Sequence, residues 1–312
     1  MKKAKILIAS KIDASAITKL EEKFDVICAF NADSETLKEK IKECSILVFR
    51  SGVQITREVM QSSDKLRLIL RAGSGVDNID MNYVAENPSI KLVRIPQPGA
   101  RAVAELSFAL MLALSRSLIV ANQSVQEGRW IKNQLTGYLL KNKVLGIVGA
   151  GNIGCTVGQM GHSWGMNVIG CIDEATHPAD VKPADYGVEL MSLEEVMKRS
   201  DYVSIHVPKT EKTIYMINKE NLSLMKPGAF LMTLARGKVV NEKDLLGALT
   251  KENGLGGAGL DVHEVEGEGM KSPLAGLPNV ILTPHIGAAT YDSMYEIGQI
   301  VIKHANEFYN SL

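Results

Sequence analysis

The chain has 312 residues, and Lys plus Arg equals Asp plus Glu at 35 each, so the formal net charge is zero. This balance provides no overall field for nucleic acid or an anionic membrane surface, and we expect neither as a partner. Hydrophobic residues make up 46% and charged residues 22%, which is the composition of a globular protein. At about 100 to 200 residues per domain, the length predicts two domains.

Four cysteines are spread along the chain without the CxxC pairing or histidine spacing of a zinc site. We therefore expect no metal, reduced thiols and a cytoplasmic location. The N-terminal apolar run in MKKAKILIAS is too short for a signal-peptide core. The longest apolar region, 103–121, is interrupted by Glu105 and Arg116, so we expect no membrane span.

Short apolar runs alternate with amphipathic stretches in the first part of the chain. The apolar runs are KILIAS, DVICAF, ILVFR, LRLIL and KLVRI. This alternation predicts βαβ units and a parallel sheet. The prolines of PQPG, at 96–99, are expected to break any helix and to form a hinge before a long helix that starts near Ala102.

A second set of strands begins at Val144 and continues through NVIGCID, YGVEL, YVSIHVP, AFLMTLA, GAGLDV and NVILTPH. We predict an α/β protein with two doubly wound parallel-sheet domains and a cleft between them. A flavodoxin-like substrate domain is expected to comprise 1–98 plus 290–312. A Rossmann NAD-binding domain is expected over 99–289. The amphipathic helix from Thr290 to Tyr309 is expected to return to the first domain.

A glycine-rich turn follows the apolar run VLGIV. GAGNIG places Gly149, Gly151 and Gly154 in the GxGxxG spacing. The first glycine permits the turn out of the strand, the second lets the backbone approach a pyrophosphate, and the third lets the helix pack closely. The helix N-terminus then presents N–H groups and a positive dipole end to the phosphates. Alone, such a turn also serves connections that bind no ligand.

Asp173 ends the next apolar strand and strengthens the prediction of a dinucleotide site. A carboxylate at this place accepts hydrogen bonds from both hydroxyls of an adenosine ribose. Glu174 adds a second acid, and no lysine or arginine follows until Lys182, so a ribose 2′-phosphate would be repelled. The sequence therefore predicts NAD rather than NADP.

Three polar residues follow strands of the second set, where the ligand of a doubly wound sheet lies. Arg236 follows AFLMTLA, Glu266 lies beyond GAGLDV, and His285 follows NVILTP. A histidine can exchange a hydroxyl proton near neutral pH, a carboxylate can orient it, and a guanidinium can bind a substrate carboxylate. The plain alternatives are a solvated cap, an exposed loop acid and a packed histidine. His206 is the rival histidine, to which we assign a structural or supporting role.

These segments together resemble a known family. GAGNIG, the acid at Asp173, TLARG, LDVHEVE, TPHIGAAT and RAGSGVDNID look like the D-isomer-specific 2-hydroxyacid dehydrogenases, closest to D-3-phosphoglycerate dehydrogenases of the short form. The resemblance implies that Arg236, Glu266 and His285 are catalytic. It also implies cofactor contacts from Ser74, Asn152, Ile153, Asp173, Val207, Leu234, Ala235, Arg236, Asp261, His285, Gly287 and Ala288.

The first domain is expected to bind the substrate. Glycines in RAGSGVD allow a carboxylate to approach the backbone N–H groups of this loop, and Arg50 and Arg71 end neighbouring apolar runs. Guanidiniums suit a phosphate through charge-assisted bonds, although arginines also cap strands or pair with nearby acids. The expected substrate contacts are Arg50, Arg71, Ser74, Gly75, Val76, Arg101 and Arg236.

The sequence predicts NAD-dependent oxidation of D-3-phosphoglycerate to 3-phosphohydroxypyruvate, a step of serine biosynthesis. A glyoxylate or hydroxypyruvate reductase, or another D-2-hydroxyacid dehydrogenase, is the alternative within the class. An NADH-sensing corepressor-like scaffold is the alternative outside it. The resemblance further implies a homodimer formed through the helix that starts near Ala102. Gly267 stands where the family usually has proline, which predicts a more mobile Glu266 loop.

Overall fold

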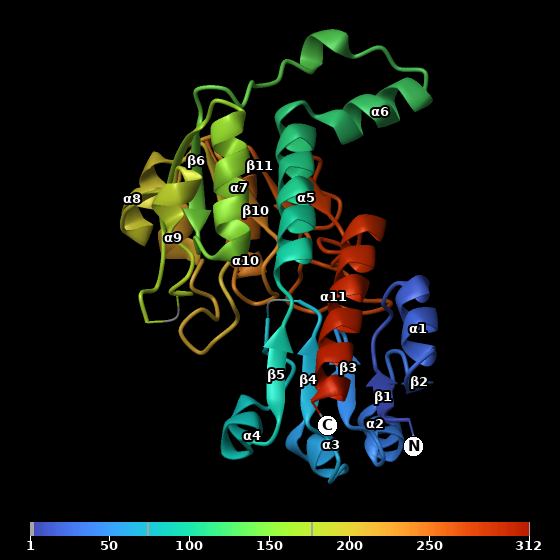
Figure 1. Ribbon diagram of the computed structural model, residues 1–312. Coiled ribbons are helices and arrows are strands. Elements are labelled where there is room, and N and C mark those ends of the chain that lie inside the picture. Colours follow the sequence, from blue (N-terminus) through green and yellow to red (C-terminus); the bar gives the residue numbers. More distant parts are fainter. Residues whose placement is uncertain (1–2, 74, 176, 312) are drawn as a thin grey trace. The chain divides into compact units, whose positions relative to one another are not determined.

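The computed structural model describes residues 3–73, 75–175 and 177–311. Its contacts divide the chain into two compact units: unit 1 is Met1–Gly99 with Ala288–Leu312, and unit 2 is Ala100–Gly287. Each unit is an α/β fold built on its own parallel sheet, which confirms the predicted fold class (Figure 1). Binding of the substrate by unit 1 stays a prediction.

Unit 1 contains a five-stranded sheet in the order β2-β1-β3-β4-β5. Its strands are parallel, with Ile6 of β1 paired to Val26 on one side and to Ile46 on the other. The order reverses between β1 and β3. The strands are β1 (Lys5–Ile8), β2 (Asp25–Cys28), β3 (Ile46–Phe49), β4 (Leu68–Arg71) and β5 (Lys91–Arg94).

Helices cover both faces of this sheet, and this explains why its central strand β3 is apolar throughout. One core joins Ile6 and Ile8 to residues of α1 and α11, and the other joins Leu7 and Leu47 to residues of α2 and α3. Five side chains cap the helices of unit 1 by accepting N–H groups of the first turn; they are Asp13, Asp33, Thr56, Asp80 and Thr290. The helices are α1 (Ala14–Glu21), α2 (Ser34–Ile41), α3 (Arg57–Gln61), α4 (Met81–Glu86) and α11 (Tyr291–Asn310).

The C-terminal helix α11 belongs to unit 1, as its amphipathic pattern predicts. Ile297, Val301 and Ala305 form its buried stripe and pack in the core that contains β1 and α1. Figure 1 shows this helix beside the strands of the N-terminal segment although it is the last element of the chain.

Unit 2 contains a seven-stranded parallel sheet in the order β12-β11-β10-β9-β6-β7-β8. The direction of chain progression reverses between β6 and β9, which creates a topological switch point where ligands of such sheets bind. The strands are β6 (Val144–Val148), β7 (Asn167–Cys171), β8 (Glu189–Leu190), β9 (Tyr202–Ile205), β10 (Phe230–Thr233), β11 (Gly257–Leu260) and β12 (Val280–Leu282). The α-helices are α5 (Gln97–Ser115), α6 (Leu118–Gln126), α7 (Asn152–Ser163), α8 (Leu193–Arg199), α9 (Lys219–Leu224) and α10 (Glu242–Thr250), with 3-10 turns at Lys132–Gln134 and Pro183–Tyr186.

The expectation that PQPG would interrupt the helix is wrong. Helix α5 begins at Gln97 and includes Pro98 in its first turn. Proline is tolerated there because the first N–H groups of a helix have no intrahelical acceptor and its fixed φ suits the helix.

Among the residues that the structure describes, no single helix is long and apolar enough to cross a membrane. Helices α5 and α6 pass such a test only as a pair, by length and composition, and the pair is bent by 61°. Much of the apolar face of α5 is buried, including Ala104, Phe108 and Met111. The described part of the chain also contains no group of three or more His, Cys, Asp or Glu side chains arranged to hold a metal ion.

Candidate active site and dinucleotide pocket

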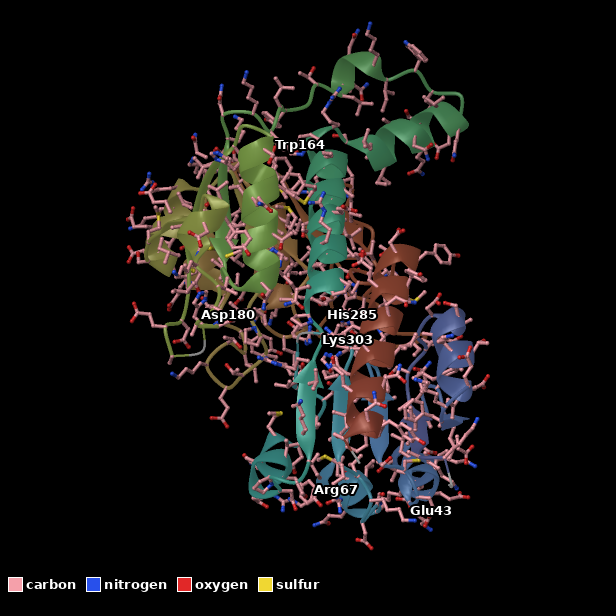
Figure 2. All side chains as sticks on the ribbon, viewed as in Figure 1. Glu43, Arg67, Trp164, Asp180, His285 and Lys303 are labelled. Carbon is pink, nitrogen blue, oxygen red and sulfur yellow. The ribbon has the colours of Figure 1, made fainter. Side chains whose placement is uncertain are left out.

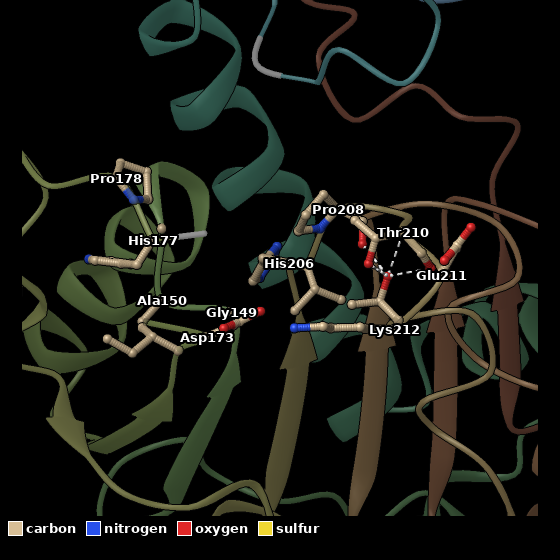
Figure 3. A pocket seen from close by; sticks show the side chains of 14 residues that line it. Gly149, Ala150, Asp173, His177, Pro178, His206, Pro208, Thr210, Glu211 and Lys212 are labelled. Carbon is tan, nitrogen blue, oxygen red and sulfur yellow. Dashed lines mark hydrogen bonds between the residues drawn. The ribbon is translucent and has the colours of Figure 1, made fainter. Parts of the chain in front are cut away.

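A pocket of about 410 Å³ opens at the carboxyl ends of β6, β7 and β9, at the switch point of the unit 2 sheet. Gly149, Gly151, Asp173 and Val207 line it, and all four are predicted cofactor contacts (Figure 3). They come from turns that are far apart in the chain. The parallel topology brings them together because it places the ends of neighbouring strands at one edge.

The glycine turn has the form that a pyrophosphate requires. Gly149 has a φ of +93°, and a Cβ there would lie 2.9 Å from the carbonyl carbon of His206. A Cβ on Gly154 would lie 2.2 Å from the Gly149 oxygen, so the helix packs directly on the turn. A Cβ on Gly151, in contrast, would meet nothing within 4 Å. The turn therefore leaves open space where backbone and ligand would meet.

Helix α7 adds electrostatic attraction to this turn. Its N-cap is Gly151, which supplies no side-chain acceptor to the first turn. That first turn consists of Asn152, Ile153 and Gly154, which directly follow the glycine loop. A helix N-terminus favours an anion through its N–H groups and dipole, and the residues present fit a dinucleotide phosphate.

The part of the pocket near Asp173 contains charges of both signs. Asp173 lies beyond β7, and its Oδ1 accepts the N–H of Ala175 at 3.1 Å. Lys212 also lines the pocket, and Figure 3 shows its side chain extending toward Gly149 and Asp173. Lys212 lies in the loop after β9, far in sequence from Asp173 at the end of β7, so spacing along the chain does not predict that both line one pocket.

His206 lines the same pocket but does not have the properties of a proton acceptor. Its Nε2 lies 2.8 Å from Ser204 Oγ, and burial lowers the pKa of His206 to about 3. Its structural or supporting role stays a prediction.

The second group of side chains follows the neighbouring strands β10, β11 and β12. Arg236 follows β10, Glu266 lies in the connection after β11, and His285 follows β12. The Nδ1 atom of His285, labelled in Figure 2, lies 2.9 Å from Oε2 of Glu266. Nη1 of Arg236 donates to the Ala235 carbonyl at 2.8 Å, and its charge acts on His285. The structure thus brings together the three residues predicted to be catalytic.

The His285–Glu266 pair is half-exposed and electrostatically coupled. The side chains are 34% and 39% exposed. The hydrogen bond with Glu266 raises the pKa of His285, and its effect outweighs partial burial and the Arg236 charge, which lower it. For Glu266, burial raises the pKa. The hydrogen bond and charge of His285, together with the His263 N–H, outweigh burial, so the pKa of Glu266 is lowered. Glu266 is therefore an acceptor, Nδ1 of His285 carries the hydrogen, and Nε2 of the neutral ring keeps its lone pair.

Asp261 fixes the loop that carries His285. It is 1% exposed; its Oδ1 accepts Thr283 Oγ1 at 2.6 Å and Ile286 N–H at 2.9 Å, and its Oδ2 accepts Gly287 N–H at 2.7 Å. His285 has a φ of +54°, an unfavourable conformation for a residue with a side chain, so such restraint is needed. A contact between Asp261 and the nicotinamide stays a prediction.

The remaining predicted cofactor residues lie in different parts of the chain. Leu234 and Ala235 are buried just before Arg236, at 4% and 5% exposure. Ala288 falls in unit 1, where its carbonyl accepts Nη2 of Arg50 at 3.1 Å and Oγ of Ser293 at 3.0 Å. Ser74 lies outside the described residues.

Gly267 does not prevent the Glu266 loop from holding its carboxylate. Both oxygens of Glu266 accept hydrogen bonds, Oε1 from the N–H of His263 at 3.1 Å and Oε2 from His285. Gly267 has a φ of +144°, far from the φ of about −65° to which proline is restricted. In this conformation a proline at 267 does not fit.

In unit 1, the predicted substrate residues differ in burial. Arg71 is 3% exposed, lies over the Phe49 ring, and donates from Nε to the Gly75 carbonyl and from Nη1 to the Ala72 carbonyl. It shapes the glycine loop, and its contact with a substrate phosphate stays a prediction. Gly75 and Val76 are half-buried in that loop.

The other two arginines have separate environments. Arg50 is half-buried, and burial lowers its pKa. Arg101 is an exposed residue of α5 in unit 2, where its Nε binds Glu105 at 2.7 Å. Arg101 belongs to unit 2, within the predicted range 99–289, and its contact with a substrate stays a prediction.

A seven-stranded Rossmann sheet with a glycine turn and an acid after its second strand is the architecture of nicotinamide-dinucleotide-binding proteins. The family sequence model described as "D-isomer specific 2-hydroxyacid dehydrogenase, NAD binding domain" matches residues 108–287. The chain belongs to the D-isomer-specific 2-hydroxyacid dehydrogenase family, and NAD is the cofactor of its matched domain.

Individual relatives have different names. The chain is 41% identical to a D-3-phosphoglycerate dehydrogenase of Methanocaldococcus jannaschii over 95% of its own length, but it spans only 56% of that protein. It is 36% identical to a hydroxypyruvate reductase of Thermotoga maritima, covering 96% of each chain. A crystal structure of an Aquifex aeolicus D-lactate dehydrogenase with NAD and lactic acid matches with a TM-score of 0.84 at 29% identity, covering 98% of this chain and 96% of the other.

Proposed function

We propose that the chain catalyses NAD-dependent oxidation of D-3-phosphoglycerate to 3-phosphohydroxypyruvate, a step of serine biosynthesis. The 2.9 Å contact between His285 Nδ1 and Glu266 Oε2 carries the dehydrogenase part of this proposal. It is a proton-transfer pair at the strand ends of a dinucleotide-binding sheet. The phosphoglycerate part is supported by the 41% identical relative and by Arg50 at the end of β3.

His285 acts as the base. When bound, NAD+ accepts the hydride that leaves the carbinol carbon of the substrate. Nε2 of neutral His285 takes the hydroxyl proton as the C–H electron pair departs and the carbonyl forms. In the reverse direction the imidazolium returns the proton to the carbonyl oxygen.

Glu266 and Arg236 support this transfer. Because Nδ1–H of His285 donates to Glu266, the carboxylate fixes the tautomer and stabilises the imidazolium that forms. Arg236 binds the substrate carboxylate through parallel N–H bonds and polarises the neighbouring oxygen. The backbone N–H groups of Gly75 and Val76 are the further carboxylate contacts of the proposal.

Arg50 provides the selectivity for a phosphorylated substrate. Among the described residues, the Arg50 guanidinium donates to the Ala288 carbonyl, and this bond uses only part of its five N–H donors. Arg71 is engaged with its own loop, so Arg50 is the better candidate for a phosphate contact.

A panel of substrates tests the proposal by NADH absorbance. D-3-Phosphoglycerate, D-glycerate and D-lactate are offered with NAD+, and glyoxylate and hydroxypyruvate with NADH. D-3-Phosphoglycerate should give the highest kcat/KM. The Arg50→Ala variant should raise its KM about tenfold or more while leaving that of D-glycerate nearly unchanged, because a charge-assisted bond is lost. An equal rise for both substrates removes the phosphate argument.

A glyoxylate or hydroxypyruvate reductase is the second candidate. The relative with that activity in its name matches over 96% of its own length, whereas the phosphoglycerate dehydrogenase is covered only in part. Faster reduction of hydroxypyruvate than oxidation of D-3-phosphoglycerate decides for this alternative. Absence of turnover with every acid decides for a scaffold that senses NADH.

A cytoplasmic homodimer completes the proposal. Apolar side chains are exposed on α6 and the following segment, and Figure 1 shows this part of unit 2 extending away from the seven-stranded sheet. Such surfaces mark interaction sites; the exposed fractions are 58% for Ile119, 61% for Val125, 82% for Trp130 and 73% for Leu139. Light scattering should give twice the monomer mass, and Ile119→Glu should reduce it to one chain. The four free cysteines are consistent with a reducing compartment.

A further inference from the structure

A buried carboxylate outside the proposed catalytic set holds the loop that carries Glu266. Glu242 is the first residue of α10 and is 2% exposed. Its Oε1 accepts the N–H of Glu264 at 2.7 Å, and its Oε2 accepts Oγ–H of Ser272 at 2.6 Å. Glu242 therefore binds the β11–β12 connection on both sides of Glu266.

The attachment at Glu264 is reciprocal. The N–H of Glu242 donates to Oε1 of Glu264 at 2.8 Å, and Tyr215 Oη donates to Oε2 of the same carboxylate at 3.2 Å. Two backbone N–H groups and two carboxylates thus close a ring between the start of α10 and the loop. The N-terminus of α10 favours the negative charge of Glu242.

The segment between these attachments has few other restraints. Val265 and Met270 are 60% and 61% exposed, and Gly267 and Gly269 both have positive φ. Exposed side chains and glycines give the backbone of Glu266 little packing to fix its position. The bonds that Glu242 makes to the flanking residues therefore restrain the backbone of Glu266, in addition to the hydrogen bond from the His263 N–H to its carboxylate.

The same loop contacts the turns that carry Arg236 and His285. A Cβ on Gly237 would lie 1.9 Å from the His263 carbonyl oxygen, so the turn after β10 lies directly against the loop. Nε2 of His263 donates to the Thr283 carbonyl at 3.0 Å, and the N–H of His285 donates to that carbonyl at 3.1 Å. A displacement of the loop thus reaches the peptide next to His285 as well as its carboxylate partner.

We propose that Glu242 is a positioning residue for the Glu266–His285 pair; this inference rests on the proposed function. Through Glu264 and Ser272 it sets the distance between Glu266 Oε2 and His285 Nδ1, and thereby the basicity of His285. A role limited to the stability of α10 is the alternative.

Three variants distinguish these roles. Glu242→Ala removes both attachments, whereas Glu242→Gln keeps an acceptor for the Glu264 N–H and a polar partner for Ser272. Asp244→Ala is the matched control: Asp244 lies in the same first turn, but its carboxylate accepts the N–H of Lys219 rather than a group of the loop.

The main readout is the pH titration of His285 followed by proton NMR, with the signal identified by its loss in His285→Gln. In Glu242→Ala the midpoint should fall, and kcat should drop about tenfold because the Glu266–His285 pair is misplaced, while KM for NAD changes less than about twofold. Glu242→Gln should restore most of the His285 midpoint and most of kcat. Asp244→Ala should change neither the midpoint nor kcat.

An unchanged His285 midpoint in Glu242→Ala overturns the inference, and so does an equal shift in Asp244→Ala. If Glu242→Ala does not fold, Ser272→Ala removes one attachment and should move the midpoint in the same direction by a smaller amount; an unchanged midpoint in that variant is also contrary to the inference. The titration needs no substrate. Failure of the parent protein to oxidise any 2-hydroxy acid therefore counts against the proposed function, while the NMR result still decides the role of Glu242.

Discussion

The strand ends of the two units carry similar polar residues but use them in different ways. In unit 1, Arg71 is almost fully buried, and its guanidinium donates to carbonyls of the next loop. In unit 2, His285 and Glu266 are each more than one-third exposed and bind each other. A buried charge that is satisfied by its own backbone holds a loop in shape, whereas a half-exposed titratable pair can exchange a proton with a ligand.

The largest expected effect tests the chemical role of the unit 2 pair. His285→Gln removes the proposed base and should lower kcat by about 10³-fold, within the range for general acid–base groups. His206→Gln is the control, because His206 is neutral over the whole physiological range and should change kcat far less. Steady-state NADH formation measures both. The opposite ranking means that the base is misassigned.

Glu266→Gln should have the next largest effect, about 10²-fold on kcat, at the low end of the same range. The carboxylate raises the pKa of His285, so oxidation, which needs the neutral ring, increases as pH rises through that raised value. Without the carboxylate the imidazolium loses its partner, its pKa falls, and the acid limb of kcat/KM moves to lower pH. If the acid limb of kcat/KM stays in place or moves to higher pH, Glu266 does not raise the pKa of His285.

Arg71→Ala tests the structural half of the comparison. Loss of a buried guanidinium leaves two carbonyls without their donor and should reduce the free energy of unfolding by about 2–4 kcal/mol. Arg101→Ala removes an exposed i,i+4 pair and should cost under about 0.5 kcal/mol. Urea unfolding measures both. A KM increase restricted to phosphorylated substrates would instead assign Arg71 to the phosphate.

The smallest expected effect concerns the cofactor. Asp173→Ala should raise the KM for NAD about tenfold, since one charge-assisted contact with ribose is lost. The parent protein should show a lower KM for NAD than for NADP. Equal values would indicate that Lys212, which points toward Asp173 in Figure 3, offsets the repulsion of a 2′-phosphate.

Much of the fold is predictable from local patterns. Strands buried on both faces, such as β3 and β6, are continuous apolar runs, and α11 has a clear apolar stripe. The start of α5 is not predictable in this way, because a proline that interrupts a helix interior is compatible with its first turn.

The candidate site also has one part that the sequence predicts and one part that only the tertiary structure determines. The sequence predicts the glycine turn, Asp173, and the residues Arg236, Glu266 and His285, because each follows an apolar strand and stands in a motif that resembles the family. Tertiary structure decided which of these groups meet, because contacts between loops depend on sheet order and not on spacing in the chain. It alone revealed Lys212 in the pocket, Arg71 turned inward, and Glu242 beneath the Glu266 loop. Burial and hydrogen-bond partners, which determine whether a charged side chain shapes a loop or acts on a ligand, arise only when distant segments pack together.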